Sequence, residues 1–387
     1  MRKPFTGYPD LWGLFMPQAQ RLISTVDHVV EHPEVWTKRL SKSRWGDRIP
    51  HVEYSSQEGD AWFVDGRRLP LSECAQVGAV MNDRADAPKR WGDVPPSAYL
   101  PAERLRAMDT DGVAYSVLYP SFAGFSGETF GALTDSDLEL DCVQAYNDWL
   151  IEEWVTCSDR FIPQCIVPLG PAEATVGEIK RAVGRGHKGV VFPAAPMNLR
   201  KAPHINAPAY DPIWATCRDL RVPLCFHAGS ARQLQFPVAP RLSPELAAAM
   251  QAVTRPASAV FDLVNLLFSR ILLRFPSLKV IFAESTIGWG TFILEYADHQ
   301  YEQDHCDYEL KPSEMFKRQC YLTAWYDPVR INARHIGADR ILWATNFPTA
   351  NSSWPDSQGL VEKCFEGMTE EERNQILRRN AAELYKL

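Results

Sequence analysis

The sequence predicts an α/β barrel in which eight parallel strands alternate with helices. Three observations support this fold class. Eight short apolar runs have the length of strands and are rich in Val, Ile, Leu and aromatic residues. Amphipathic stretches of helical length lie between several of these runs. No Gly-rich phosphate loop follows an early run, as an open doubly wound sheet would favour. We therefore expect one distorted (β/α)8 barrel domain over residues 1–387.

The expected strands start near the N-terminus with LISTVDH and continue beyond residue 110. Helical patterns separate them, and the tail from Thr369 opens with a Thr-x-x-Glu capping box. The strands are expected at 22–28, 113–120, 161–169, 189–193, 222–229, 278–285, 320–327 and 340–346, and the helices at 135–156, 172–186, 211–221 and 257–275.

Residues 37–110 interrupt this alternation with a stretch rich in Pro, Asp and charged residues. We interpret the stretch as an insertion after strand one that contains a small hairpin. In a barrel of this topology such an insertion is expected over the mouth, where sites form and where it would shape a substrate pocket.

Composition excludes several functions. A net charge of −7 and a pI near 5.8 argue against nucleic-acid and acidic-membrane partners, because both need a basic face. No apolar run is long enough to span a bilayer, and the first twenty residues lack the apolar core of a signal peptide. The nine cysteines form no C-x-x-C pair and no disulfide framework. We therefore expect a cytoplasmic protein that acts on a small molecule.

Polar side chains stand at several carboxyl ends of the expected strands, where barrel enzymes place their chemistry. His28 and Glu31 follow strand one, His227 ends strand five, Glu284 ends strand six and Asn346 ends strand eight. Imidazole and carboxylate groups at one barrel mouth are typical of a divalent metal site.

Several motifs resemble the amidohydrolase-related family that contains the aminocarboxymuconate-semialdehyde and aromatic-acid decarboxylases. They are ISTVDHVVEHPEVW, QAYNDWL, FHAGS, FPSLKVIFAESTIGWGTFILEYADHQYE, ILWATNFPTANSSWPDS and NAAELY. The resemblance implies a distorted barrel with one divalent metal. It implies as usual ligands an acid-or-His-x-His pair on strand one, a His on strand five and an Asp on strand eight. It also implies a homodimer.

The sequence departs from that ligand pattern at two positions. Val26 stands at the first position of the strand-one pair, and Asn346 stands at the strand-eight position. Residues two apart on a strand share a face, so Val26 and His28 point inward together while Asp27 points away. An amide is also far too weak a base to take a proton from metal-bound water. The usual mechanism cannot run unchanged.

We expect a replacement ligand set that restores carboxylate charge. Glu284 is expected to face inward because its neighbour two residues back, Phe282, fits an inward stripe. Two simpler alternatives stay open: Glu31 hydrogen-bonds backbone, and Glu284 pairs with an arginine. The expected ligands of one or two Zn, Fe or Mn ions are His28, His227, Glu31 and Glu284.

The expected function is hydrolysis of an ester, thioester, amide or lactone of a small apolar or aromatic carboxylic acid. Glu284 is expected as general base, with His227 and Asn346 as the other catalytic residues. The first alternative is a metal-dependent non-oxidative decarboxylase, and the second is a metal-free relative that only binds a ligand. The expected substrate pocket is lined by Tyr119, Ser121, Phe192 and Trp325.

Overall fold

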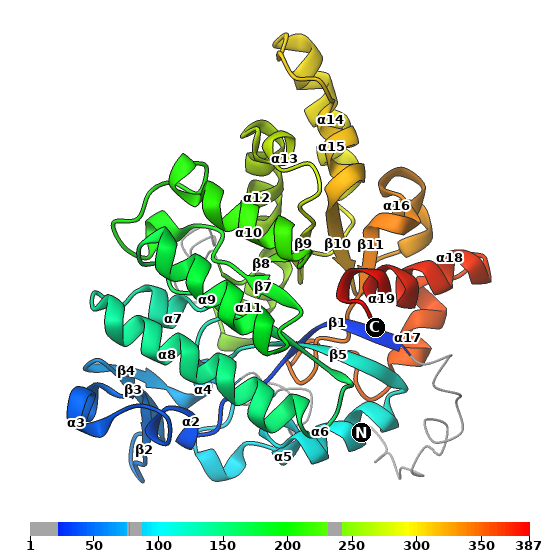
Figure 1. The fold of residues 1–387 in the computed structure, drawn as a ribbon. Coiled ribbons are helices and arrows are strands. Elements are labelled where there is room, and N and C mark those ends of the chain that lie inside the picture. Colours follow the sequence, from blue (N-terminus) through cyan, green and yellow to red (C-terminus); the bar gives the residue numbers. More distant parts are fainter. Residues whose placement is uncertain (1–21, 76, 78–86, 231–241) are drawn as a thin grey trace.

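The computed structural model describes residues 22–75, 77, 87–230 and 242–387. Its centre is a sheet of eight parallel strands curled into a barrel, and helices surround it (Figure 1). Every strand expected from the sequence is present. The strands are β1 (Leu22–His28), β5 (Val113–Tyr119), β6 (Phe161–Cys165), β7 (Gly189–Val191), β8 (Leu224–His227), β9 (Val280–Ala283), β10 (Cys320–Ala324) and β11 (Ile341–Trp343).

The sheet closes between its first and last strands. The strand order runs β1-β5-β6-β7-β8-β9-β10-β11, and each neighbouring pair is parallel. The chain just after β11 then hydrogen-bonds β1: the Asn346 amide donates to the Val26 carbonyl at 3.0 Å, and the His28 amide donates to the Phe347 carbonyl at 2.7 Å. This closure brings the carboxyl ends of β1 and β11 together at one mouth.

Side chains alternate between the barrel interior and the surrounding helices. Alternate residues, among them Val26, Cys225 and Ala283, pack together inside the barrel. Their neighbours on the same strands, such as Phe226, pack outward against helices. From the C-terminal helix α19 (Asn380–Tyr385), Tyr385 joins the interior cluster. The interior is therefore filled with side chains, as is usual for such barrels.

The expected helices are present, with small differences at their ends. The stretch expected at 135–156 is α8 (Ser136–Trp149) followed by a π-helical segment (Leu150–Val155). The stretch expected at 257–275 is divided into α12 (Ala257–Phe268) and α13 (Ile271–Arg274). Thr369 forms the expected capping box with Glu372. The longer helices are α6 (Pro101–Thr110), α8 (Ser136–Trp149), α9 (Ala172–Arg185), α10 (Asp211–Leu220), α11 (Pro244–Thr254), α12 (Ala257–Phe268), α14 (Gly290–Gln303), α15 (Pro312–Gln319), α16 (Val329–Ile336) and α17 (Ser357–Cys364). The shorter ones are α2 (Glu34–Thr37), α3 (Lys42–Trp45), α4 (Leu71–Cys74), α5 (Pro96–Tyr99), α7 (Glu128–Gly131), α13 (Ile271–Arg274) and α18 (Glu370–Asn374).

The insertion forms a small antiparallel sheet rather than a single hairpin. Its strands are β2 (His51–Glu53), β3 (Ala61–Val64) and β4 (Arg67–Pro70), in the order β2-β3-β4. Trp62 of β3 stacks on Phe122, with ring centroids 4.1 Å apart, and Arg67 donates to the Thr129 carbonyl at 2.7 Å. The described part of the insertion thus supports the loop that follows β5. Its last ten residues belong to the helix α6, which leads into β5.

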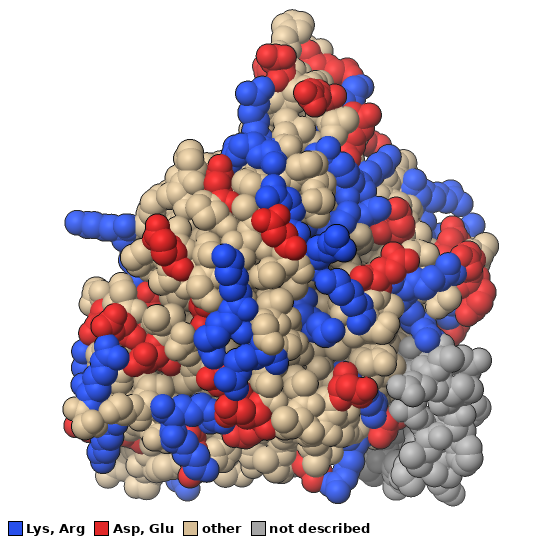
Figure 2. Space-filling view, in the orientation of Figure 1, with Lys and Arg blue, Asp and Glu red and all other residues tan. Residues whose placement is uncertain are grey.

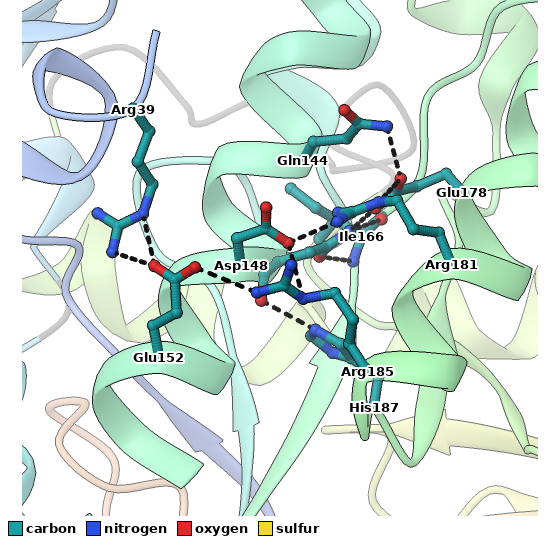
Figure 3. A network of polar contacts seen from close by, with 10 residues as sticks. Arg39, Gln144, Asp148, Glu152, Ile166, Glu178, Arg181, Arg185 and His187 are labelled. Carbon is teal, nitrogen blue, oxygen red and sulfur yellow. Dashed lines mark hydrogen bonds and ion pairs between the residues drawn. The ribbon is translucent and has the colours of Figure 1, made fainter. Parts of the chain in front are cut away.

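A polar network holds α8 and α9 against the barrel (Figure 3). Asn147 donates to the Ile166 carbonyl at 3.0 Å and accepts from the Ile166 amide at 3.1 Å, so its amide group bonds backbone just beyond β6. Glu178 of α9, fully buried, accepts from Asn147 at 2.7 Å and from Arg181 at 2.7 Å. The QAYNDWL motif therefore serves packing at this position.

The surface carries mixed charge. Figure 2 shows acidic and basic side chains interspersed over the face that it displays. Among the described helices, none has both the length and the apolar character needed to cross a membrane. The expectation about a signal peptide concerns residues 1–21, which lie outside the described residues.

Candidate metal centre

Three polar side chains from three strands converge at the carboxyl end of the barrel. His28 ends β1, His227 ends β8 and Glu284 directly follows β9. Their ligand atoms all lie within 4.8 Å of one another, and the two imidazole centroids are 5.1 Å apart. All three side chains are buried. Two neutral nitrogen donors and one carboxylate form a mixed set that suits a divalent transition metal.

The imidazoles are oriented by backbone groups. His28 Nδ1 lies 3.0 Å from the Pro120 carbonyl; the Nδ1–H group donates a hydrogen bond to this oxygen, which leaves the Nε2 lone pair available. The Gly229 amide donates to His227 Nδ1 at 3.2 Å. Burial lowers the pKa of each imidazole to about 3; the neighbouring His227 adds to the effect on His28, and Arg255 adds to it on His227. Both rings are therefore neutral at pH 7, as metal ligands must be.

Several buried polar atoms of the group have no hydrogen-bond partner among the described residues. They are Nε2 of His28, Nε2 of His227, Oε2 of Glu284 and Oδ1 of Asn346. A buried polar atom without a partner is costly, so a cluster of such atoms calls for a ligand. The lone pairs of His28 Nε2, Glu284 Oε2 and Asn346 Oδ1 fit a divalent cation, and His227 offers the lone pair of whichever ring nitrogen carries no proton.

Glu284 enters the barrel by a backbone turn that strand alternation does not predict. Phe282 packs outward beside Phe226, at 6.2 Å between ring centroids, whereas Ala283 faces the interior. The prediction that Phe282 faces the barrel interior, from which the inward position of Glu284 was inferred, is therefore wrong. Glu284 has φ of +54°, and this left-handed conformation turns its side chain back toward His227. Such a conformation costs roughly 1 kcal/mol or more in a residue with a Cβ, and it is concentrated at functional sites.

Asn346 and Arg255 both bind the carboxylate of Glu284. Asn346 Nδ2 donates to Oε1 at 3.1 Å, and Arg255 Nη1 donates to the same oxygen at 3.4 Å. His227 Nδ1 lies 3.7 Å from the other oxygen, Oε2. The alternative left open by the sequence, in which Glu284 pairs with an arginine, is therefore partly correct, because Arg255 is one of the groups that contact this carboxylate. The position of Asn346 is fixed by its own left-handed backbone, with φ of +56°.

Glu31, expected as a fourth ligand, does not join this group. Its carboxylate accepts three backbone N–H groups, from Ser121 at 3.2 Å, Phe122 at 2.8 Å and Ala123 at 3.0 Å. Burial raises its pKa to about 7 despite these bonds. Glu31 holds the loop after β5 in place, which is the backbone-bonding alternative that the sequence left open.

Asp27 and Val26 lie as strand alternation predicts. Val26 packs inside the barrel below His28. Asp27 points the other way, where it accepts from Ser116 at 2.5 Å and from Thr345 at 2.7 Å. It therefore links β1 to its two neighbours in the closed sheet and cannot replace the carboxylate that Val26 lacks.

The four residues expected to line a pocket lie in different surroundings. Tyr119 is inside the barrel, with its ring centroid 5.3 Å from that of His227. Ser121 is buried on the loop held by Glu31. Trp325 is buried just beyond β10 and packs against Tyr326. Phe192 was wrongly expected in the pocket.

Phe192 faces the helices outside the barrel. It packs edge-to-face on Trp214 and Tyr210, at 5.2 and 5.7 Å between centroids. The reason is alternation along β7, since Val191 takes the inward position. Phe192 therefore belongs to the outer core.

The comparisons with known proteins agree with this fold. A model of the amidohydrolase family matches residues 45–387. The chain belongs to the amidohydrolase family. Among curated proteins it is similar to the gamma-resorcylate decarboxylase of Rhizobium sp. (strain MTP-10005), at 23% identity over 314 residues, which cover 73% of this chain and 86% of that protein.

Solved structures confirm the same architecture. An amidohydrolase from Mycobacterium avium subsp. paratuberculosis K-10 superposes with a TM-score of 0.74 at 20% identity, covering 95% of this chain and 98% of the other. The 5-carboxyvanillate decarboxylase from Novosphingobium aromaticivorans DSM 12444, solved with manganese and a nitrobenzoic acid, gives a TM-score of 0.66 at 17% identity, covering 96% and 97%. The barrel of this amidohydrolase and the family resemblance read from its motifs are thereby confirmed.

Sequence reasoning missed Phe125, which lies over the two imidazoles of this amidohydrolase. Its ring stacks on His227 at 4.8 Å and 22° and meets His28 edge-on at 5.1 Å. Gly229 makes the stack possible, because a Cβ there would lie 2.2 Å from Phe125 Cδ2. The glycine in FHAGS was the available signal, but no local pattern indicates which side chain approaches it.

Proposed function

We propose that this amidohydrolase is a metal-dependent non-oxidative decarboxylase of small aromatic carboxylic acids. The proposal rests on the convergence of His28, His227 and Glu284, each with a buried atom that has no hydrogen-bond partner within the described part of the chain. Curated relatives that cover 73–83% of the chain are gamma-resorcylate decarboxylases, and they favour this reaction over the hydrolysis expected first from the sequence. The solved decarboxylases that contain manganese support Mn²⁺ as the ion.

The residues present suit loss of CO2 better than attack by water. Hydrolysis needs a free base for the proton of water, and the Asn346 amide cannot serve. Glu284 has Oε1 occupied by Asn346 and Arg255, and its Oε2 faces the imidazoles, so it is placed as a ligand. Decarboxylation requires no attacking water: the carbon–carbon bond breaks, its electron pair stays on the ring carbon, and a proton from solvent takes the vacated position.

Each residue of the group has a separable role. His28 and His227 supply neutral nitrogen ligands, and Glu284 supplies the anionic one. A bound divalent ion would add positive charge that orients an anionic substrate and stabilises negative charge developing on it. Phe125 and Tyr119 pack aromatic rings against the imidazoles, and these apolar surroundings strengthen the electrostatic interactions of the group.

Isotope experiments with the Mn²⁺-loaded protein test the proposal. Carboxyl-¹³C hydroxybenzoates, including 2,6-dihydroxybenzoate, are expected to release ¹³CO2 and, in D2O, to gain deuterium at the vacated carbon. Aryl esters in H2¹⁸O test hydrolysis in parallel. Release of ¹³CO2 should disappear in His28→Gln and persist in His299→Gln, whose residue is exposed on α14. Incorporation of ¹⁸O without CO2 release would support the hydrolase instead, and no metal-dependent turnover would support a ligand-binding relative.

A further inference from the structure

Arg255 is a cation placed at the edge of the metal group. It caps α11 at the carboxyl end of that helix, and its side chain is 24% exposed, whereas Glu284 beside it is 3% exposed. Arg255 is therefore a partly exposed cation in direct contact with a buried carboxylate of the group.

Much of the hydrogen-bonding capacity of Arg255 is unused within the described residues. A guanidinium carries five N–H donors in a planar fork that matches a carboxylate. Among the described residues, the guanidinium makes one long hydrogen bond, from Nη1 to Glu284 Oε1 at 3.4 Å. Its guanidinium carbon lies 5.9 Å from the centroid of the Phe125 ring, which is itself stacked on His227. The fork thus lies beside the Phe125 ring, with donors left for a ligand among the described residues.

The charge of the group calls for more than one negative charge on the ligand. With both imidazoles neutral, a divalent cation and Arg255 against the one carboxylate of Glu284 would leave a net charge of about +2. Val26 and Asn346, which are neutral, contribute nothing to balance it. A buried site with this excess favours a dianion over a monoanion.

The chemistry of decarboxylation decides which anionic group Arg255 serves. The carboxylate that is lost gives up its negative charge as the carbon–carbon bond breaks. An arginine paired to it would stabilise the ground state more than the transition state and would slow the reaction. A second anionic group, which stays on the product, keeps its charge throughout. Pairing with this second group orients the ring without that penalty.

We propose that Arg255 is a specificity-determining residue that binds a second carboxylate on the substrate, so that the preferred substrates are aromatic dicarboxylates. The inference rests on the proposed function and narrows its substrate class. In it, the fork of Arg255 takes a bidentate carboxylate, while the ring of the substrate lies in the aromatic surroundings of Phe125.

Binding of unreactive probes tests this without turnover. Calorimetry would compare benzoate with benzene-1,2-, 1,3- and 1,4-dicarboxylate on the Mn²⁺-loaded protein. We expect the best dicarboxylate to bind at least about tenfold more tightly than benzoate to the wild type. Arg255→Gln should remove most of that preference while benzoate affinity changes less than about threefold. Arg255→Lys should keep part of it, because an ammonium retains the charge but not the fork.

The control is Arg221→Gln, which removes an exposed arginine at the end of α10 and should leave the preference unchanged. Metal content and melting temperature of each variant establish that it is folded; if Arg255→Gln fails this check, Arg255→Lys decides. An undiminished preference in the Arg255 variants, or equal losses for benzoate and dicarboxylates, would overturn the inference. Failure of the proposed function has a different signature, since it appears as absent CO2 release whatever the binding preference.

Discussion

At the scale of single residues, Glu284 and Asn346 show how backbone conformation decides the site. Strand alternation correctly places His28 and His227 inside the barrel, because Val26 and Cys225 share their faces. It cannot place Glu284, because a φ of +54° reverses the direction that alternation gives. Left-handed residues with a Cβ have no reliable sequence signal. The carboxylate could be listed as a candidate from the sequence, but its orientation could not be derived.

Replacing Asn346 by Asp tests the charge balance of the group. The amide now donates to Glu284 Oε1 at 3.1 Å, and Asn346→Asp would put two carboxylates at that distance. Without metal we expect repulsion and a melting temperature lower by about 2–4 °C. With Mn²⁺ we expect affinity at least about tenfold higher, because the ion gains an anionic ligand. Scanning calorimetry in the presence of chelator measures the melting temperature, and titration against a metal indicator measures the Mn²⁺ affinity. If neither quantity changes in the variant, this account of Asn346 is wrong.

Gly229 and Phe125 form a pair that a double-mutant cycle can test. The Cβ of Gly229→Ala would overlap the Phe125 ring, so we expect the free energy of unfolding to fall by about 1–3 kcal/mol. In a Phe125→Ala background the same substitution should cost little, because the ring is gone. Denaturant titration of the four proteins gives the coupling energy, which we expect to exceed about 1 kcal/mol. Strictly additive costs would mean that the ring does not occupy this position.

At the scale of elements, the strands were predictable and the loops between them were not. Apolar runs of strand length predicted all eight barrel strands, because a parallel strand that is buried on both faces is rich in apolar residues. The insertion forms three strands where a two-stranded hairpin was expected. The third strand, β4, was missed because its sequence, RRLP, has no apolar pattern. The loop after β5 depends on Glu31, whose three bonds to backbone reach across 90–92 residues of sequence.

Glu31→Gln distinguishes a loop anchor from a metal ligand. A glutamine keeps one acceptor oxygen but turns an N–H2 group toward backbone N–H groups. We expect the free energy of unfolding to fall by about 1–3 kcal/mol. The dissociation constant for Mn²⁺ should stay within about threefold of wild type. An increase of tenfold or more in that constant, with the protein still folded, would return Glu31 to the ligand set.

The network between α8 and α9 makes stability depend on pH through His187. Burial lowers the pKa of His187 to about 4, and its Nε2 lies 3.0 Å from the Asn147 carbonyl. Because the pKa of a histidine in the unfolded chain is near 6.5, His187 does not reduce the free energy of unfolding above pH 6.5. Below that pH the unfolded chain binds a proton that the buried ring does not, so the free energy of unfolding falls by up to about 3 kcal/mol as pH approaches 4.

His187→Gln, which retains a donor for the Asn147 carbonyl, should therefore lose less stability than wild type between pH 7 and pH 4.5. The expected difference is about 2 kcal/mol. Urea titrations followed by circular dichroism at several pH values provide the comparison. Parallel pH profiles for the two proteins would show that His187 titrates normally.

At the scale of the whole molecule, the site exists because the barrel closes. The Asn346 amide reaches the Val26 carbonyl across 320 positions, and this contact sets strand eight beside strand one. Eight apolar strands that alternate with helical stretches made the closed barrel predictable, and with it the meeting of His28 and His227. Arg255 was not predictable, because it lies between strands, in a helical region whose position over the mouth only the folded chain defines. The sequence thus identified the strand ends that meet at the candidate metal site, but not the arginine that lies beside them.

Anomalous diffraction at the manganese absorption edge, from crystals soaked in Mn²⁺, tests the central claim most directly. The account predicts a peak at about 2.1–2.3 Å from one nitrogen of His28, one nitrogen of His227 and Oε2 of Glu284, with no peak at the Glu31 carboxylate. No peak among these three residues at saturating Mn²⁺, or a peak bound elsewhere in the barrel mouth, would contradict it.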